Sequence, residues 1–188
     1  MITENPGNES LDALRKGKSE WATFRAAADT GQDALDFSEL DLSEANLADR
    51  DLAEVDFFSS NLERANLKMC SLAGAEMASS NLSSASLYKC NLKGTIFQEA
   101  KMVRADLSDS DCTGADFRGA DLSGVNFSGA NLTGANLSRA DLTGSKLFAA
   151  TLTSVVTTGT NASSTGWCNS SKQHMVLTLQ PTAWRLNV

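Results

Sequence analysis

An apolar residue stands at every fifth position through most of this chain. The series begins at Phe37 and reaches Leu152 without a break in register. A period of five fits neither an α-helix, with about 3.6 residues per turn, nor a plain strand, with about two. It fits a unit that runs extended along one side and then turns a corner. These central positions are Phe37, Leu42, Leu47, Leu52, Phe57, Leu62, Leu67, Leu72, Met77, Leu82, Leu87, Leu92, Phe97, Met102, Leu107, Cys112, Phe117, Leu122, Phe127, Leu132, Leu137, Leu142, Leu147 and Leu152.

A second, smaller residue accompanies each central one. It stands two positions earlier, at what we call the small position, and is most often alanine, as at Ala65, Ala115 and Ala135. Residues two apart in extended backbone point the same way, so both are expected to face inward. The residue between them, the outward position, is usually Asp or Asn. We expect its side chain to hydrogen-bond to the turns and to solvent, so that the substitution Asn81→Asp is expected to be nearly silent.

The unit is clearest in residues 130–137, which read Ala-Asn-Leu-Thr-Gly-Ala-Asn-Leu. Here the sequence resembles the pentapeptide-repeat family, whose unit is alanine, Asp or Asn, leucine and two variable residues. The resemblance covers residues 35–156. It implies an all-β fold, a right-handed quadrilateral parallel β-helix, or solenoid, with four units in each coil. The chain would then form about six coils.

Phenylalanine supports four units per coil from within the sequence. Residues twenty apart should stack in neighbouring coils, and four of the five central phenylalanines share one such series: Phe37, Phe57, Phe97 and Phe117. The exception is Phe127. A single coil buries too little apolar surface to stand alone, so both ends of the solenoid are expected to need caps.

The first 34 residues predict a short N-terminal helical cap. Two segments each have a serine at the start and a glycine after the end, from Ser10 to Gly17 and from Ser19 towards Gly31. In the second segment Trp21, Phe24 and Ala28 share one face, which would cover the open end of the first coil.

Residues 157–188 are expected to form a C-terminal cap or a dimerisation tail. From Thr157 the composition is typical of a loop, followed by weak strand-like alternation from Met175 to Leu179. Trp167, Trp184 and Leu186 either seal the last coil or form a dimer contact. The protein would accordingly be a monomer, or a homodimer through the C-terminal tail.

Charge and hydropathy exclude several partners. The net charge is −7 and the isoelectric point about 4.7, which argues against direct binding to nucleic acid or to an anionic membrane. No apolar run approaches the roughly 20 residues of a spanning helix. The polar, acidic segment from Met1 to Ser10 does not resemble a signal peptide. We therefore expect a cytoplasmic protein that does not contact membranes.

The residues that usually carry chemistry are not grouped into a site. The single histidine, His174, has no carboxylate or cysteine at ligand spacing. Cys70, Cys90, Cys112 and Cys168 match neither a disulfide framework nor a zinc motif. Cys70 and Cys90 hold the small position one coil apart, where reduced filler is the favoured interpretation and a redox bridge the alternative. We expect no catalytic residue, metal or cofactor, and hence no enzyme.

Two surface features are candidates for partner binding. Eight acids and one base lie between residues 36 and 56, whereas residues 57–155 hold nine of each. The acidic ring is formed by Glu39, Glu44, Asp49 and Glu54, which repeat at the corner of all four sides. It either protects the end of the solenoid from end-to-end pairing or binds a partner. The basic corner is formed by Lys68, Met69, Tyr88 and Lys89 in adjacent coils, with Phe148 farther along.

Two functions follow. One is a non-enzymatic protein-interaction scaffold with an unidentified protein partner, suggested by the flat faces of a solenoid. The other comes from the family resemblance, since some members resemble duplex DNA in width and charge, bind DNA gyrase and confer quinolone resistance. This chain departs from that pattern because its acids are concentrated in one coil, its repeats have no loop and its tail has no clear dimerisation helix.

Overall fold

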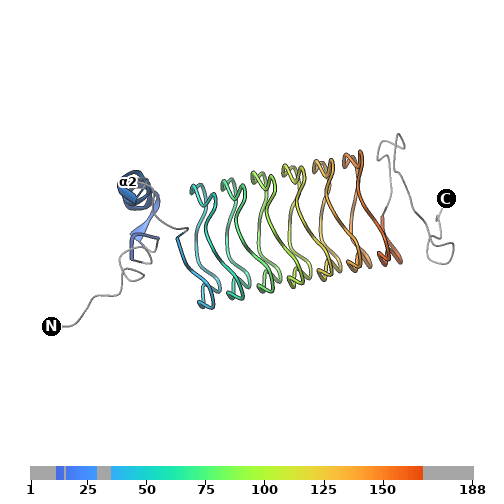
Figure 1. The fold of residues 1–188 in the computed structure, drawn as a ribbon, viewed down its shortest axis with the longest axis horizontal. Coiled ribbons are helices and arrows are strands. Elements are labelled where there is room, and N and C mark those ends of the chain that lie inside the picture. Colours follow the sequence, from blue (N-terminus) through green and yellow to red (C-terminus); the bar gives the residue numbers. More distant parts are fainter. Residues whose placement is uncertain (1–11, 15, 29–34, 167–188) are drawn as a thin grey trace.

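The protein, described by a computed structural model for residues 12–14, 16–28 and 35–166, is a rod of stacked coils with helical segments at its N-terminal end (Figure 1). Helix α2 spans Lys18–Ala28, and residues 12–14 and 16 are also helical. The rest is built from parallel β-bridges, each between residues twenty apart, from Asp36↔Asp56 to Lys146↔Gly166. The chain therefore folds as a β-helix with four five-residue sides in each coil. None of the described helices is long and apolar enough to cross a membrane.

The sides are named here after the central residues of the first coil, residues 35–54: the Phe37, Leu42, Leu47 and Leu52 sides. The unit around Leu82 shows how one coil bonds to the next. Its amide donates to Lys101 O at 2.7 Å, and the Asn81 amide donates in the opposite direction, to Ser60 O at 2.9 Å. Repetition of this pattern satisfies the main chain inside the rod and leaves unpaired edges only at the two ends.

Each corner is a tight turn with positive φ at its third residue. In the same unit the Ala85 amide donates to Leu82 O at 3.0 Å, and Ser84, at the corner position, has a φ of 57°. This is the geometry of a type II turn. The outward Asp or Asn stabilises the turn, as Asp36 does by accepting a hydrogen bond from the Ser38 amide at 2.8 Å. The expected local role of these side chains is confirmed.

The core consists of the central side chains in vertical stacks. All central residues from Phe37 to Leu152 are buried. Phe37 and Phe57 stack with ring centroids 5.7 Å apart, and Phe97 and Phe117 at 5.0 Å. The exceptional Phe127 meets Phe117 edge-on at 5.8 Å. Aromatic stacking therefore accompanies the twenty-residue spacing.

Several polar residues at the small position bond to the coil before them. The Cys90 thiol donates to Leu67 O at 2.9 Å, and the Ser110 hydroxyl donates to Leu87 O at 2.6 Å. Cys70 makes the same contact with Leu47 O at 3.0 Å. The described cysteines are free and buried, so the interpretation of Cys70 and Cys90 as reduced filler is confirmed.

The helical segment sits on the first coil. Trp21 is buried, with its ring 5.9 Å from that of Phe37, and Phe24 stacks on it at 5.7 Å. The helix begins at Lys18 rather than at Ser19, after Gly17 with a φ of 137°. The side chain of Ala28, expected on the same face, lies outside the described part of the structure.

The repeat continues past its expected end at residue 156. Bridges join Asp141 to Asn161 and Lys146 to Gly166, so residues 157–166 extend the coil and are not a loop. The pattern was hidden because Thr157 and Ala162 replace large apolar residues at the central position. The expectations for Trp167, Cys168, His174, Trp184, Leu186 and the strand-like segment from Met175 to Leu179 lie outside the described residues.

Candidate interaction surfaces

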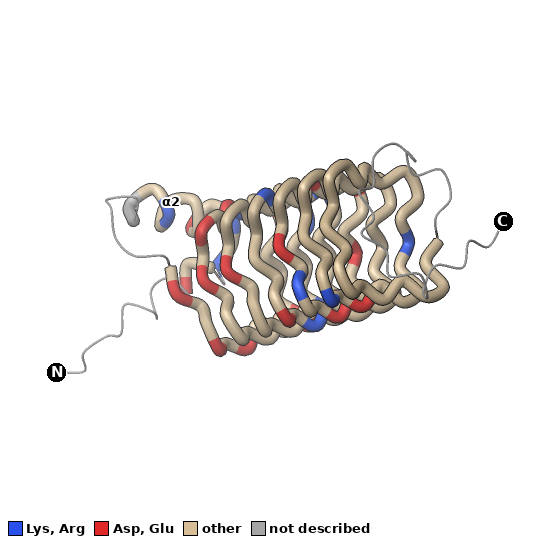
Figure 2. Tube along the Cα trace, turned by 45° about the vertical axis from the view of Figure 1, so that its right-hand side comes forward, with Lys and Arg blue, Asp and Glu red and all other residues tan. Residues whose placement is uncertain are grey.

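The acidic ring lies around the first coil, and acids gather at this end of the rod (Figure 2). Its four side chains are exposed, and all four residues are at corners with φ between 57° and 60°. Two of them have basic neighbours: Glu44 pairs with Arg64 at 3.1 Å, and Asp49 lies 4.0 Å from Lys18. The members of the acidic ring are Glu39, Glu44, Asp49 and Glu54.

The helical segment lies beside only part of the acidic ring. Trp21 Nε1 donates to Asp51 O at 2.6 Å, and the Arg25 guanidinium donates to Ala53 O at 3.0 Å. These carbonyls lie on the Leu52 side, at the open edge of the first coil. Asp49 and Glu54 therefore border the helical segment, whereas Glu39 and Glu44 border the other two sides.

Arg50 is a residue that sequence reasoning missed. It holds a small position, yet it is only 6% exposed. Its guanidinium donates to Asn46 O at 2.8 Å and to Leu14 O at 3.0 Å, so it joins the first coil to the helical segment. The signal was present, because a long charged side chain at a position otherwise held by small or apolar residues predicts a special contact.

The residues of the basic corner lie next to one another, on the Leu47 side of the second and third coils, where the repeat predicts them. The Met69 amide donates to Tyr88 O at 2.9 Å, and the Lys89 ammonium lies 5.1 Å from the centre of the Tyr88 ring. Hydrogen bonding and charge at Tyr88 raise the pKa of Lys89. Met69 is 58% exposed, and Lys68 is exposed beside it. The corner thus combines two ammonium groups with an exposed thioether.

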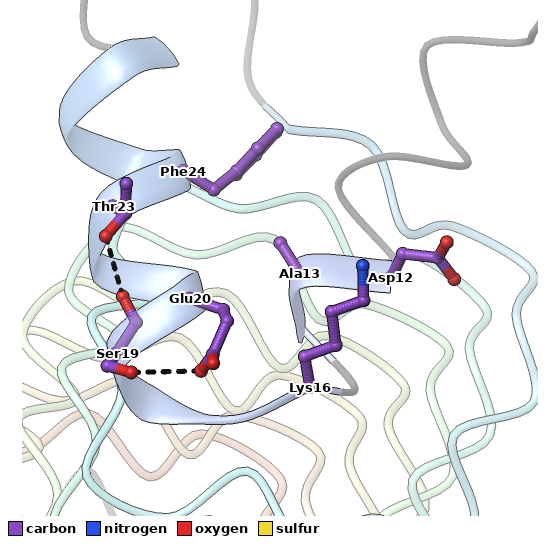
Figure 3. A pocket seen from close by; sticks show the side chains of 7 residues that line it. All are labelled: Asp12, Ala13, Lys16, Ser19, Glu20, Thr23 and Phe24. Atoms are coloured by element: carbon purple, nitrogen blue, oxygen red, sulfur yellow. Dashed lines mark hydrogen bonds between the residues drawn. The ribbon is translucent and has the colours of Figure 1, made fainter.

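A hollow between the helical turn at residues 12–14 and α2 is shown in Figure 3. Within it Glu20 accepts a hydrogen bond from the Ser19 hydroxyl at 3.0 Å. Bonds from its own backbone amide and from Ser19 lower the pKa of Glu20, which favours a carboxylate over a proton donor. The lining residues are Asp12, Ala13, Lys16, Ser19, Glu20, Thr23 and Phe24.

The interior thiols are held in the protonated form. Burial raises the pKa of Cys70 to about 11 and that of Cys90 to about 12, and it also raises the pKa of Cys112. A thiol of this kind is a poor nucleophile at neutral pH. Within residues 12–14, 16–28 and 35–166, no three side chains of His, Cys, Asp or Glu are placed to hold a metal ion.

The family model described as pentapeptide repeats (8 copies) matches this chain in three segments, residues 36–72, 70–109 and 110–147. These segments cover more than half of the chain, which therefore belongs to the pentapeptide-repeat family. None of the curated proteins searched matches it.

Several solved structures are similar to this chain, and the first two named here are pentapeptide-repeat proteins. One is HetL from the cyanobacterium Nostoc sp. strain PCC 7120, a protein involved in heterocyst differentiation regulation, with 25% identity over 71% of this chain and 75% of that one (TM-score 0.31). Another is Rfr23 from the cyanobacterium Cyanothece 51142, with 29% identity over 60% and 64% (TM-score 0.33). A trypsin-treated variant of QnrB1, a plasmid-mediated fluoroquinolone resistance protein, has 19% identity over 70% of each chain (TM-score 0.42).

Proposed function

We propose that this chain is a non-enzymatic scaffold that binds a protein partner through the outer side chains of its rod. The observation that carries the proposal is the division of labour within each unit. Central and small side chains fill the interior, main-chain groups join the coils, and outward Asp and Asn side chains serve the turns. Binding is left to the corners and to the residues just before them.

The basic corner and the acidic ring are the two surfaces best suited to this role. An exposed methionine beside a half-buried tyrosine can pack against an apolar group of a partner, and the neighbouring lysines give direction to the contact. The acidic ring presents the opposite charge one to two coils away along the rod. A partner that contacts both would be fixed in orientation.

The proposal also covers the compartment, the excluded partners and the oligomeric state of the protein. The excess of acid disfavours direct binding to nucleic acid and to anionic lipid, and we place the protein in the cytoplasm. It acts as a monomer or as a homodimer through the C-terminal tail. Neither cofactor nor metal takes part in binding.

Affinity capture from native cell extract, followed by mass spectrometry, tests this function. Met69→Asp should release a partner that uses the basic corner. The matched control is Ala149→Asp, which holds the same corner position four coils farther on. Retention of a protein by the parent and by the control, but not by Met69→Asp, supports the scaffold. Identical retention by all three, together with identical retention when the four acids of the acidic ring are changed to amides, would overturn it.

A further inference from the structure

The described residues cover only half of the open edge of the first coil. In later coils the carbonyls of the outward residue and of the residue after the central one accept bonds from the preceding coil, as Asp56 O does from Phe37 N at 2.7 Å and Phe58 O from Glu39 N at 2.8 Å. The equivalent carbonyls of the first coil face the open end. Those of the Leu47 and Leu52 sides receive bonds from Arg50, Trp21 and Arg25. On the Phe37 and Leu42 sides, four carbonyls accept no hydrogen bond from any residue in the described ranges: Asp36, Ser38, Asp41 and Ser43.

Apolar surface is exposed along the same half of the edge. Leu35 and Leu40 hold the small positions of the Phe37 and Leu42 sides, and both are only half-buried. In the second coil the equivalent residues, Val55 and Ser60, are 0% and 1% exposed. The difference arises because a preceding coil covers Val55 and Ser60, whereas no described coil precedes the two leucines.

Carboxylates lie beside these four carbonyls. Asp36, Glu39, Asp41 and Glu44 are all exposed on the same two sides. The one ion pair that the described residues form with them is between Arg64 and Glu44. A second copy of this chain would bring its own four carboxylates to the same place, and like charges would oppose such a pairing.

We propose that this half-edge binds an extended basic peptide segment by strand addition, with Lys or Arg alternating with apolar residues. Its amides would donate to the free carbonyls, its apolar side chains would point inward onto Leu35 and Leu40, and its cations would meet the carboxylates outside. The alternation follows from the unit itself, in which central residues point inward and their neighbours outward. This inference rests on the proposed scaffold function and names the chemistry of the partner.

A short peptide of alternating lysine and valine is a direct probe. We expect it to bind, and to bind more weakly as salt is raised. The double variant Glu39→Gln/Glu44→Gln should weaken binding about fivefold, the effect of two charges at the margin of an interface. Glu99→Gln is the matched control, because Glu99 is exposed at the same corner as Glu39 three coils away, and it should bind the peptide as the parent does.

Two readouts separate strand addition from simple charge attraction. The Asp41 amide, which faces the open edge, should become protected from hydrogen exchange on binding, while the Asn61 amide, already bonded to Leu40 O at 2.8 Å, should not change. A peptide N-methylated at alternate residues keeps its charge but loses the donors, and it should not bind. Equal binding of the methylated peptide, or equal weakening by Glu99→Gln, would overturn the inference. If neither peptide binds while a partner is still captured through Met69, the inference fails and the scaffold function stands.

Discussion

At the scale of the residue, the corner position makes the strictest demand on the backbone. Its φ is positive in unit after unit, and glycine occupies it at Gly114, Gly119, Gly124, Gly129 and Gly134. Other residue types pay a steric cost in this conformation. Some glycines also leave room for the corner side chain one coil earlier, since a Cβ at Gly119 would stand 3.4 Å from Glu99 Cγ.

The corner conformation predicts opposite effects for two matched substitutions. A Cβ at Gly134 would meet nothing within 4 Å, so the effect of Gly134→Ala comes from its φ of 68° alone. We expect a loss of about 1 kcal/mol in the free energy of unfolding. Ala149→Gly, at a φ of 56°, should gain a similar amount, less the entropy cost of glycine. Urea denaturation gives the free energy of unfolding of both variants. If both substitutions lower it, the positive φ at the corner is not the cause of these stability changes.

The contacts of Asn81 argue against the expectation that Asn81→Asp is nearly silent. Its Nδ2 donates to Asn61 Oδ1 at 3.1 Å and to Glu63 Oε2 at 3.4 Å. Asn81→Asp would replace this donor by a carboxylate facing two acceptors, and we expect a loss of about 1 kcal/mol in denaturation experiments. Asn46→Asp is the control, because toward the described residues the Asn46 side chain acts as an acceptor: its Oδ1 accepts from Asn66 Nδ2 at 2.9 Å and from the Ala48 amide at 3.5 Å. Equal effects of the two changes would exclude the side-chain ladder as the cause.

The outward aspartates link stability to pH. Hydrogen bonds from the Ser43 side chain and amide lower the pKa of Asp41, and Ser38 does the same for Asp36. Because the folded pKa lies below the unfolded one, folding is favoured while the groups are ionised and loses this contribution as pH falls through the folded pKa. Stability should therefore decline below about pH 4. Asp41→Asn keeps the acceptor but does not titrate. Urea denaturation at several pH values should therefore show a shallower fall in its free energy of unfolding than in that of the parent. An equally steep fall would contradict this account.

At the scale of the element, the helical segment contacts the first coil through both side chains and main chain. Trp21 contributes apolar burial and a hydrogen bond to the edge, and Arg50 bonds back to Leu14 O. Interior coils, by contrast, have a coil on each side. In a solenoid, stability comes from nearest-neighbour contacts, so damage at one end need not spread.

Trp21→Ala should therefore loosen the end of the rod more than its middle. Truncation of a buried tryptophan costs about 3–5 kcal/mol, and we expect this loss in the opening of the first coil. Hydrogen exchange should accelerate at the Leu42 amide while the Leu122 amide keeps its protection. Thr23→Ala, on the exposed face of α2, is the control and should leave both rates nearly unchanged. Equal acceleration at both amides would show that the rod opens as a whole.

How far each element could be predicted depended on whether its contacts repeat. The coil, the aromatic stack and the position of the basic corner follow from period and spacing, because every unit solves the same packing problem. The bonds of Trp21, Arg25 and Arg50 to main-chain carbonyls are made once, at the end of the rod, so the repeat does not predict them. The one sequence signal for them is Arg50 itself, a long charged residue at a small position. The extension to Gly166 was missed for a related reason, since hydrogen bonds between coils continue where Thr157 and Ala162 weaken the apolar signal.

At the scale of the whole molecule, the N-terminal end of the rod is acidic, whereas the rest has balanced charge. The acids crowd into the first coil, and nine acids balance nine bases in residues 57–155. A mimic of duplex DNA needs negative charge along its length. This distribution is the physical reason to rank the scaffold above gyrase binding.

A supercoiling assay with DNA gyrase tests that ranking. We expect no inhibition or protection by the unmodified protein at micromolar concentration, because five of its coils cannot imitate a duplex. Reversal of the charges at Glu39, Glu44, Asp49 and Glu54 should then change nothing. Inhibition that weakens with salt and disappears on charge reversal would promote the DNA-mimic function instead.

The twenty-residue pairing also governs which insertions and deletions this gene can tolerate. Loss of five residues inside the rod would keep every turn and every hydrogen bond possible. However, each later unit would then lie on the neighbouring side of the rod. The ring of Phe97 would then no longer lie in the same stack as Phe57, and outer residues that now share one side of the rod would lie on different sides. Loss of twenty residues would only shorten the rod by one coil. Length changes in multiples of twenty residues are thus the ones that preserve a binding face, and the rod can grow or shrink by whole coils without redesign.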